Sequence, residues 1–337
     1  MSFYQGKKVL ITGGCGFIGS NLAIRLVAEG ADVTVVDSMI DEYGGNMHNI
    51  APVIDDIRLN ISDVRDQVAT RYLVRGKEVI FNLAGQVSHI DSMRDPFTDL
   101  EINAKAQLGV LEACRHNNRE ARIVLSSTRQ IYGKPQYMPV DEKHPLDPVD
   151  INGINCIAGE WYHLLYHKVY GIPATVLRLT NTYGPRQLLK HNRQGFIGWF
   201  IRLVMQNKEI QLYGDGSQRR DLNYVDDVVQ ALLLAGEKDE AVGEVYNLAG
   251  DTPISLKDLV HKMVSISGRG SYKLVPWPEE KKKIDIGDFY GDGTKIRNAL
   301  GWTPAISTDE GLRRTFEFYE NCLDEYLDDS DGPDPKP

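Results

Sequence analysis

Short apolar segments alternate with longer amphipathic segments along the first half of the chain. Runs typical of strands, rich in β-branched residues, occur at KKVLITGG, ADVTVVD, EVIFNLAG, ARIVLSST and PATVLRLTNTYG. Helical patterns lie between them, at about residues 21–29, 64–75, 98–117 and 155–170. Strands that alternate with helices predict right-handed β-α-β units. We therefore expect an α/β fold with a doubly wound parallel sheet covered by helices on both faces.

The regular alternation weakens after about residue 181. A polar stretch, GPRQLLKHNRQGF, is followed by an amphipathic helix, IGWFIRLVMQN. We predict a sheet domain over residues 1–180 plus about 223–250. A smaller, mixed α/β C-terminal lobe is expected over about 181–222 plus 251–327. The end of the chain, residues 328–337, is acidic and rich in proline, which predicts disorder.

Composition narrows the class of protein. The chain has 337 residues, 42% of them hydrophobic and 25% charged, with a net charge of −9. This balance argues against a general nucleic-acid binder, which needs a basic face. No apolar run approaches the roughly 20 residues that span a bilayer, and the N-terminus has no signal-peptide pattern, so no membrane partner is expected. The four cysteines lack C-x-x-C spacing, which favours a reduced, cytoplasmic protein without a metal site.

A glycine-rich loop follows the first predicted strand and leads into a helix. Gly13, Gly16 and Gly19 occur in ITGGCGFIGSNLAIRL. Such glycines permit a tight turn and close approach of the backbone to a pyrophosphate, which the free N–H groups of the helix N-terminus can bind. The second strand ends in Asp37, at the distance where a carboxylate would hold a ribose 2′-hydroxyl. Asp37 favours NAD over NADP, because a 2′-phosphate would meet a like charge.

With these residues, the sequence resembles the extended short-chain dehydrogenase/reductases, the NAD-dependent epimerases and dehydratases that act on nucleotide sugars. The resemblance extends over nearly the whole chain. It is carried by GGCGFIG, LNISD, FNLAGQVS, EINAKAQLGVLEAC, SSTRQIYG, RLTNTYGPR, LYGDGSQRRDLNYVDDVV and DGTKIRNALGWTP. It implies a doubly wound cofactor domain, tightly held NAD and a nucleotide-diphosphate sugar as substrate. It also implies a homodimer that packs through the helices near 98–117 and 155–170.

The resemblance assigns roles to individual residues. The cofactor contacts that it implies are Gly13, Gly16, Phe17, Ile18, Gly19, Asp37, Asn60, Ile61, Leu83, Ala84, Gly85, Asn103 and Ser126. Thr128 takes the place of the catalytic Ser or Thr. Asn181 and Arg220 take the places that grip the diphosphate, and Arg186 is a further candidate, since a guanidinium matches a phosphate. Gln86 and Ser88 are expected either to contact the sugar or to pack the loop.

One departure from the family concerns its catalytic pair. Family members use a tyrosine as a phenolate base and a lysine one helical turn later, which lowers the pKa of that tyrosine. Aligning IAGE places Asn152 and Cys156 at these positions. The i, i+4 spacing is kept, but an amide exchanges no proton near neutral pH and a thiol carries no positive charge. A purely structural interpretation makes Asn152 a helix cap and Cys156 a small buried residue.

A second departure lies beside Thr128. Family members that dehydrate or decarboxylate sugars often have an acidic residue just after this threonine. Here Arg129 and Gln130 follow it. No carboxylate is available there as the acid for water loss, which weakens dehydration by the usual route.

Three interpretations of the missing pair remain. In the first, an active enzyme recruits another base, for which the candidates are Tyr132, Tyr162, His163, Tyr183, His89 and Asp91. In the second, the protein binds NAD and a nucleotide sugar without turnover. In the third, Cys156 is an introduced substitution for a lysine. We predict an NAD-dependent enzyme that forms a transient keto sugar and most readily epimerises it. Dehydration or decarboxylation with an atypical base is the enzymatic alternative.

Overall fold

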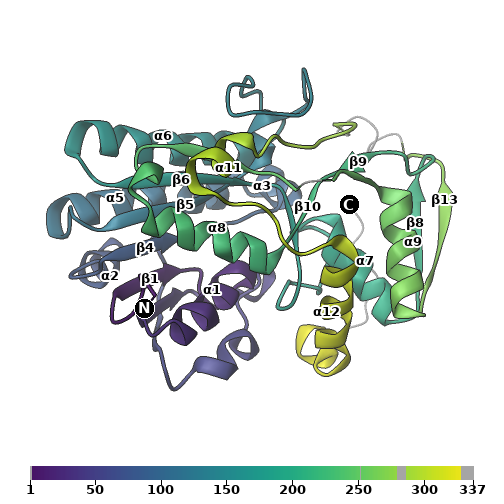
Figure 1. Ribbon diagram of the computed structural model, residues 1–337, viewed down its shortest axis with the longest axis horizontal. Coiled ribbons are helices and arrows are strands. Elements are labelled where there is room, and N and C mark those ends of the chain that lie inside the picture. Colours follow the sequence, from purple (N-terminus) through teal and green to yellow (C-terminus); the bar gives the residue numbers. More distant parts are fainter. Residues whose placement is uncertain (1, 251, 279–285, 328–337) are drawn as a thin grey trace.

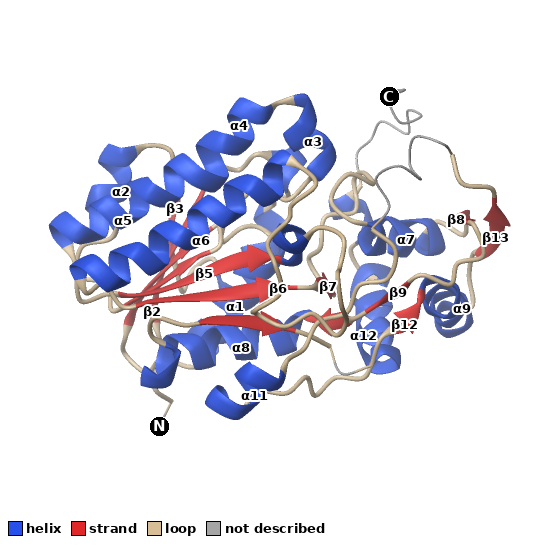
Figure 2. Cartoon of the chain, turned by 90° about the horizontal axis from the view of Figure 1, so that it is seen from above, coloured by secondary structure: helices blue, strands red, loops and turns tan. Residues whose placement is uncertain are grey.

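The computed structural model describes residues 2–250, 252–278 and 286–327. Its main feature is a seven-stranded parallel sheet with the strand order β11-β6-β5-β4-β1-β2-β3 (Figure 2). The strands are β1 (Lys8–Thr12), β2 (Asp32–Asp37), β3 (Arg58–Ile61), β4 (Val79–Asn82), β5 (Arg122–Thr128), β6 (Ala174–Leu179) and β11 (Val245–Leu248). The direction of winding reverses between β1 and β4, so the sheet is doubly wound, as predicted.

Helices cover both faces of this sheet (Figure 1). One face carries α1 (Phe17–Ala28) and α8 (Val225–Glu237). The other face carries α2 (Gln67–Leu73), α5 (Ala106–Asn117) and α6 (Ile151–Tyr170). Because both faces are covered, most strands consist of continuous apolar runs rather than alternating apolar and polar residues.

The core of this domain lies on both sides of the sheet. Val9 and Ile11 of β1 are buried in one cluster with residues of α1 and α8. Leu10 is buried in a second cluster, with Leu111 of α5 and Tyr166 of α6. Successive side chains of a strand point to opposite faces, so one strand contributes to both clusters.

The helical segment predicted at 98–117 is divided in the structure. It begins as α4 (Pro96–Leu100), passes through a π-turn, η3 (Glu101–Lys105), and continues as α5. Pro96 suits the first turn of a helix, because backbone N–H groups there have no intrahelical acceptor and the lack of one costs no hydrogen bond. The short α3 (His89–Arg94) comes just before it. The remaining short turns are η1 (Asp41–Tyr43), η2 (Met47–Val53), η4 (Arg129–Tyr132) and η5 (Asp239–Ala241).

The sequence predicted a smaller, mixed α/β lobe, and the structure contains one. This lobe faces the carboxyl ends of the strands. Its helices are α7 (Phe196–Met205), α9 (Leu256–Ser267), α12 (Thr308–Glu320) and the turn η6 (Leu323–Tyr326). Within the described part of the lobe the strands form three pairs, β8 (Glu209–Tyr213) with β13 (Ser271–Val275), β7 (Asn181–Tyr183) with β10 (Leu222–Tyr224), and β9 (Arg219–Arg220) with β12 (Ile254–Ser255). A separate hydrophobic cluster fills the lobe.

The chain crosses between the two parts more than once. After β10 it returns to the sheet through α8 and β11. Helix α11 (Thr294–Leu300) and Trp302 also pack in the cluster of the sheet domain. The Trp302 indole donates to the Asp227 carbonyl at 2.8 Å, and the Asp227 carboxylate accepts the Ala305 amide at 2.9 Å. Part of the segment predicted for the lobe therefore rests on α8.

Three findings concern the chain as a whole. All four cysteines are free thiols, two buried and two partly buried. Among the helices of the described residues, none combines the length and the hydrophobicity that a bilayer-spanning segment requires. The acidic tail at 328–337, for which disorder was predicted, lies outside the described residues.

Candidate active site

A cavity of about 1300 Å³ lies between the sheet and the lobe. Its floor is formed where strands end, by residues such as Gly13, Asp37, Leu83 and Ser126, and the lobe contributes residues such as Trp199. Ligands of open α/β sheets bind at the carboxyl ends of the strands. The volume exceeds that of an ordinary single-ligand pocket, at roughly 300–1,000 Å³, so the cavity has room for a cofactor and a substrate together.

The glycine loop forms one end of this cavity. Gly16 precedes the first turn of α1 without a side-chain cap, and Phe17 and Ile18 of that turn line the cavity. The first N–H groups of a helix lack intrahelical partners, so they are available to an anion. Gly19 must lack a side chain, because a Cβ there would lie 2.2 Å from the Gly13 carbonyl oxygen. This close packing fits a pyrophosphate held at the helix N-terminus.

Asp37 is fixed at the end of β2. Its two carboxylate oxygens accept the backbone amides of Cys15 and Met39, each at 2.9 Å. Burial raises the pKa of this carboxyl group above its ordinary value. Asp37 lines the cavity and can accept a neutral ribose hydroxyl, whereas a phosphate at that place would be repelled. The residues present therefore fit a dinucleotide with an unphosphorylated ribose.

The structure places Asn60 and Ile61, two of the expected cofactor contacts, away from the cavity wall. Both side chains are exposed on the edge strand β3, Ile61 to 65%, and neither lines the cavity. Asp63 and Val64, two and three residues beyond the strand, line it instead. A carboxylate followed by an aliphatic residue just past a strand end was the available signal. The resemblance had assigned this pair of contacts to Asn60 and Ile61, three residues earlier.

The loop after β4 lines the cavity through Leu83, Ala84 and Gly85. The amides of Leu83 and Ala84 both donate to the Thr12 hydroxyl at 3.1 Å, which fixes the loop against β1. Asn103 holds the same loop from outside the cavity. Its amide group accepts the Gln86 amide at 3.1 Å and donates to the Gln86 carbonyl at 2.8 Å. Asn103 is therefore a residue that positions the loop.

Gln86 and Ser88, candidate sugar contacts, are turned into the protein. Both are buried, and neither lines the cavity. The Ser88 amide donates to the Gln86 side chain at 2.7 Å, and the Ser88 hydroxyl accepts the Asp91 amide at the start of α3. Of the two expectations for these residues, the structure supports loop packing.

The end of β5 contributes Ser126, Thr128, Arg129 and Gln130 to the cavity wall. The Arg129 guanidinium lies over the Phe289 ring, 4.9 Å from its centroid. Burial, together with the nearby Arg220, lowers the pKa of Arg129 to about 10. Arg129 therefore remains a cation near neutral pH. No carboxylate occupies this stretch of the wall.

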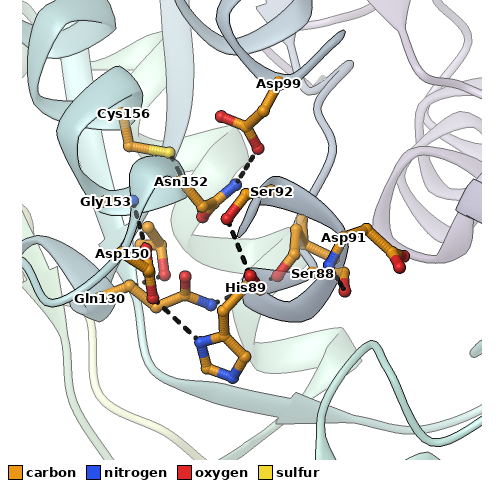
Figure 3. A network of polar contacts seen from close by, with 12 residues as sticks. Ser88, His89, Asp91, Ser92, Asp99, Gln130, Asp150, Asn152, Gly153 and Cys156 are labelled. Carbon is orange, nitrogen blue, oxygen red and sulfur yellow. Dashed lines mark hydrogen bonds and ion pairs between the residues drawn. The ribbon is translucent and has the colours of Figure 1, made fainter. Parts of the chain in front are cut away.

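Asn152 does not line the cavity. It is 1% exposed, and its amide nitrogen donates to the Gln86 carbonyl at 2.6 Å and to the buried Asp99 carboxylate at 3.0 Å. The helix cap of α6 is Asp150, whose carboxylate accepts the Gly153 amide at 2.7 Å. The interpretation of Asn152 as the cap is therefore wrong. Its role is to tie α6 to the loop after β4, and Figure 3 shows its second bond, to Asp99.

Cys156 is partly buried one turn after Asn152 and lies outside the cavity wall. Its Sγ atom is 3.8 Å from the Asn152 side-chain oxygen. Burial, then the nearby Asp99 and Glu160 carboxylates, raises the pKa of the thiol well above its ordinary value. The thiol therefore stays protonated near neutral pH. The helix positions at 152 and 156 supply no acid or base to the cavity.

Of the three residues expected at a diphosphate, two line the cavity and one does not. Asn181 and Arg220 lie in its wall. Arg186 lies elsewhere. Its guanidinium donates to the Asn49 carbonyl at 3.1 Å and to the Asn21 side chain at 3.0 Å. These bonds join the segment after β7 to α1 and η2, so Arg186 serves packing.

Five of the six candidate replacement bases do not line the cavity. The Tyr132 hydroxyl donates to Asn247, the His163 ring contacts the Gly159 carbonyl, and the Tyr183 hydroxyl donates to the Thr308 carbonyl. Tyr162, on α6, is partly buried against the hydrophobic cluster that α5 and α6 share. Asp91 is paired with Arg193 at 3.4 Å and does not line the cavity. His89 lines it.

Comparisons with known proteins agree with this architecture. A family model described as GDP-mannose 4,6 dehydratase matches residues 10–315. A putative UDP-glucose 4-epimerase of Methanocaldococcus jannaschii is 32% identical over 316 residues, which cover 93% of this chain and 98% of that protein. Both relationships extend over nearly the full length.

Solved structures show the same fold. A UDP-glucose 4-epimerase from Thermotoga maritima, solved with UDP-glucose, superposes with a TM-score of 0.84 and 31% identity over 94% of this chain and 99% of that chain. A dTDP-glucose 4,6-dehydratase from Streptomyces venezuelae, solved with NAD and TYD bound, has a TM-score of 0.84 and 27% identity over 94% and 98%. The cavity described above therefore belongs to a fold whose solved members include nucleotide-sugar enzymes.

Proposed function

This chain belongs to the epimerase and dehydratase family whose model is described as GDP-mannose 4,6 dehydratase, and on that premise we propose that it is an NAD-dependent enzyme that modifies a nucleotide-diphosphate sugar. The reaction passes through a transient keto sugar, and its outcome is epimerisation. The observation that carries the proposal is the cavity itself. The glycine loop and Asp37 line it on the side of the sheet, and Arg220 lines it on the side of the smaller lobe.

The cofactor end of the cavity fits NAD. The uncapped first turn of α1 offers N–H groups to the pyrophosphate, and Asp37 accepts a ribose hydroxyl. Asp63 and Val64 line the same end, and Leu83 to Gly85 lie along its floor. NAD bound there would serve as the two-electron acceptor for the sugar. The residues of this chain would hold it in place and exclude water.

The substrate end fits an anionic nucleotide sugar. Arg220 and Asn181 line the wall that the lobe presents, and Arg129 remains protonated beside Arg220. Guanidinium groups bind phosphate through paired donors, so two of them suit a diphosphate better than a neutral sugar. Thr128 would donate a hydrogen bond to a sugar hydroxyl. The lack of a carboxylate at 129 and 130 favours epimerisation over dehydration.

The test begins with the purified protein. Denaturation should release NAD, measured by absorbance and mass spectrometry. The native protein is then incubated with UDP-, dTDP-, CDP- and GDP-sugars, and products are resolved by anion-exchange chromatography and NMR. Conversion of one sugar to its epimer supports the proposal.

A parallel variant, Cys156→Lys, separates the interpretations of the missing pair. Epimer formed by the unmodified chain shows that another base is in use. If only Cys156→Lys forms the epimer, the cysteine at position 156 is the cause of the lost activity. If both proteins bind NAD and sugar but neither forms a product, the proposed enzymatic activity is refuted and a non-catalytic binding protein is favoured. The burial of Asn152 away from the cavity supports that second candidate.

We further propose a cytoplasmic homodimer with the two parts described above as its cofactor domain and substrate lobe. Free thiols at all four cysteines fit a reducing compartment. On α6, apolar side chains are exposed at Ile154, Trp161 and Leu165, spaced along one helix face. The neighbouring α4 exposes Phe97 to 76%. An apolar surface of this kind is typical of a protein interface.

A further inference from the structure

We propose that His89, oriented by Asp150, is the general acid and base of the cavity and replaces the tyrosine that the family places at position 152. This inference rests on the proposed function and identifies the group that exchanges a proton with the sugar hydroxyl. The observations behind it are the position of the ring, the contacts that orient it and the exclusion of other groups.

His89 is the first residue of α3, directly after the loop that lines the cavity floor. Its side chain is 48% exposed, whereas that of Asp150 is 6% exposed. Thr128, Gln130 and Asp150 belong to the same cavity wall. A group that must meet a substrate needs this combination of an accessible ring and a buried anchor.

The contact between the two residues sets the direction of the ring. His89 Nδ1 lies 3.1 Å from Asp150 Oδ2, and Asp150 Oδ1 accepts the Gly153 amide at 2.7 Å. A carboxylate only accepts hydrogen bonds, so Nδ1 carries the proton and Nε2 presents its lone pair. Figure 3 shows the second ring nitrogen on the side of the ring away from Asp150. A base oriented by a carboxylate is the arrangement used in hydrolase triads.

The backbone around His89 is held in place. The Ser92 hydroxyl donates to the His89 carbonyl at 2.9 Å, and the Gln130 side chain donates to the Val87 carbonyl at 3.3 Å. The second bond ties the loop to the turn after Thr128. The ring and the threonine hydroxyl are therefore supported by one framework, as a catalytic constellation requires.

Four other ionisable groups that line the cavity are less suited to the role. Burial and the nearby Asp91 raise the pKa of Tyr43, which makes its phenolate harder to form. Tyr213 stacks on Trp277 in the lobe, with centroids 5.4 Å apart. Asp37 accepts two backbone amides, and Asp63 accepts the Arg65 guanidinium. Each is already committed to a structural contact.

The proton transfer follows from this geometry. As the sugar carbon is oxidised, the hydroxyl O–H bond breaks and an N–H bond forms at His89 Nε2. Bound NAD would supply the two-electron acceptor for the hydride, which is the hydrogen of the C–H bond together with its electron pair, and a ketone would remain. The Asp150 carboxylate stabilises the imidazolium. In the reverse step Nε2 returns the proton to the oxygen, so neither proton nor electrons are consumed overall.

Substitution of His89 tests the catalytic role. His89→Gln should lower kcat about 100-fold or more, as expected for loss of a general base, while the NAD content stays at the wild-type level. Added imidazole should restore part of the activity of His89→Gly, because the removed ring leaves space for it. The control is His261→Gln, on the exposed side of α9 in the lobe, which should be as active as wild type.

Asp150→Asn tests the orienting role. Asparagine remains a good helix cap, so α6 should persist and the melting temperature should change little. The amide can donate to Nδ1, which favours the opposite tautomer and should lower kcat at least 10-fold with little effect on KM. A direct readout is ¹⁵N NMR of histidine-labelled protein, with the His89 signals assigned by their loss in His89→Gln. These should report the Nδ1–H tautomer in wild type and a shift toward Nε2–H in Asp150→Asn.

The outcomes distinguish the two proposals. If wild type turns over a sugar and His89→Gln retains more than one third of its kcat, the role of His89 is refuted and the proposed function stands. An Nε2–H tautomer in wild type also refutes it, whatever the activity. If wild type contains no NAD and converts no sugar, the proposed function fails, and this inference fails with it.

Discussion

At the scale of single residues, the protein buries polar groups where they position the cavity. Asp99 accepts hydrogen bonds from three asparagine side chains, Asn103, Asn152 and Asn155, at 2.7–3.0 Å. Buried polar groups are stabilised only when their hydrogen bonds are satisfied. Asn152 is 1% exposed within this cluster, so an asparagine fits position 152, whereas the larger ring of a tyrosine would overfill the space.

Asp221 supplies a pH-dependent prediction. Its carboxyl group is fully buried, Oδ1 has no hydrogen-bond partner among the described residues, and burial raises its pKa to about 6. The folded protein then binds the proton more tightly than the unfolded chain, whose pKa is 3.8. Stability from this group is therefore present below pH 4 and is lost as the pH rises to 6, by up to about 3 kcal/mol.

Asp221→Asn should remove that loss. The free energy of unfolding of the variant minus that of wild type should be about 1–3 kcal/mol more favourable to the variant at pH 7 than at pH 4. Urea unfolding at pH 4, 5, 6 and 7 measures the difference. Asp55→Asn, at an exposed position, is the control and should show no such trend. A constant difference between Asp221→Asn and wild type across these pH values would contradict the prediction.

At the scale of elements, α6 is anchored to the sheet by a buried ion pair. Glu160 and Arg178 of β6 are 2.7 Å apart, and their side chains are only 1% and 7% exposed. Arg178 also donates to the Tyr132 hydroxyl at 2.7 Å, and Tyr132 donates to Asn247 of β11. This network connects α6, β6, η4 and β11 just behind the cavity wall. The wall depends on the position of α6, because Asp150, which lines the wall, caps that helix.

Breaking one side of this pair should be costly. Glu160→Ala leaves the Arg178 guanidinium buried without its partner and should lower the free energy of unfolding by about 3–5 kcal/mol. Replacing both residues together, as Glu160→Leu with Arg178→Met, should cost much less. Lys262→Ala, which breaks the exposed pair with Asp309, should cost less than about 1 kcal/mol. Urea unfolding of the four proteins gives the comparison, and equal losses for the single and double variants would refute this account.

At the scale of the whole molecule, no element of the described residues covers the apolar face of α6 and α4. Trp161, Leu165 and Phe97 are each more than half exposed. A second copy would bury this face, and the homodimer proposed above uses it. Because Asp150 caps α6, assembly would stabilise the helix that anchors the cavity wall.

Disruption of that face should dissociate the dimer. The double variant Trp161→Glu with Leu165→Glu places charges where apolar side chains would meet, so it should elute as a monomer in size-exclusion chromatography with light scattering, whereas wild type elutes at twice the chain mass. Leu274→Glu, at an exposed apolar position in the lobe, should remain dimeric. A monomeric wild type, or a double variant that stays dimeric, would contradict the assignment of this interface.

The sequence by itself determined the doubly wound sheet, the glycine loop and the position of Asp37. These features depend on short-range patterns, because runs of β-branched residues, helical periodicity and glycine spacing act within a few residues of the chain. It also indicated that positions 152 and 156 cannot perform the family's chemistry. That conclusion needed only the side-chain types.

Only the tertiary structure decided which side chains reach the cavity. Asn60 and Ile61 lie outside its wall and Asp63 lies within it, because the exact end of β3 depends on its pairing with β2. His89 and Asp150 are 61 residues apart in the sequence, and no local pattern relates them. They meet because parallel strands bring the loops at their carboxyl ends to one edge of the sheet, where the packing of α6 sets the direction of each side chain.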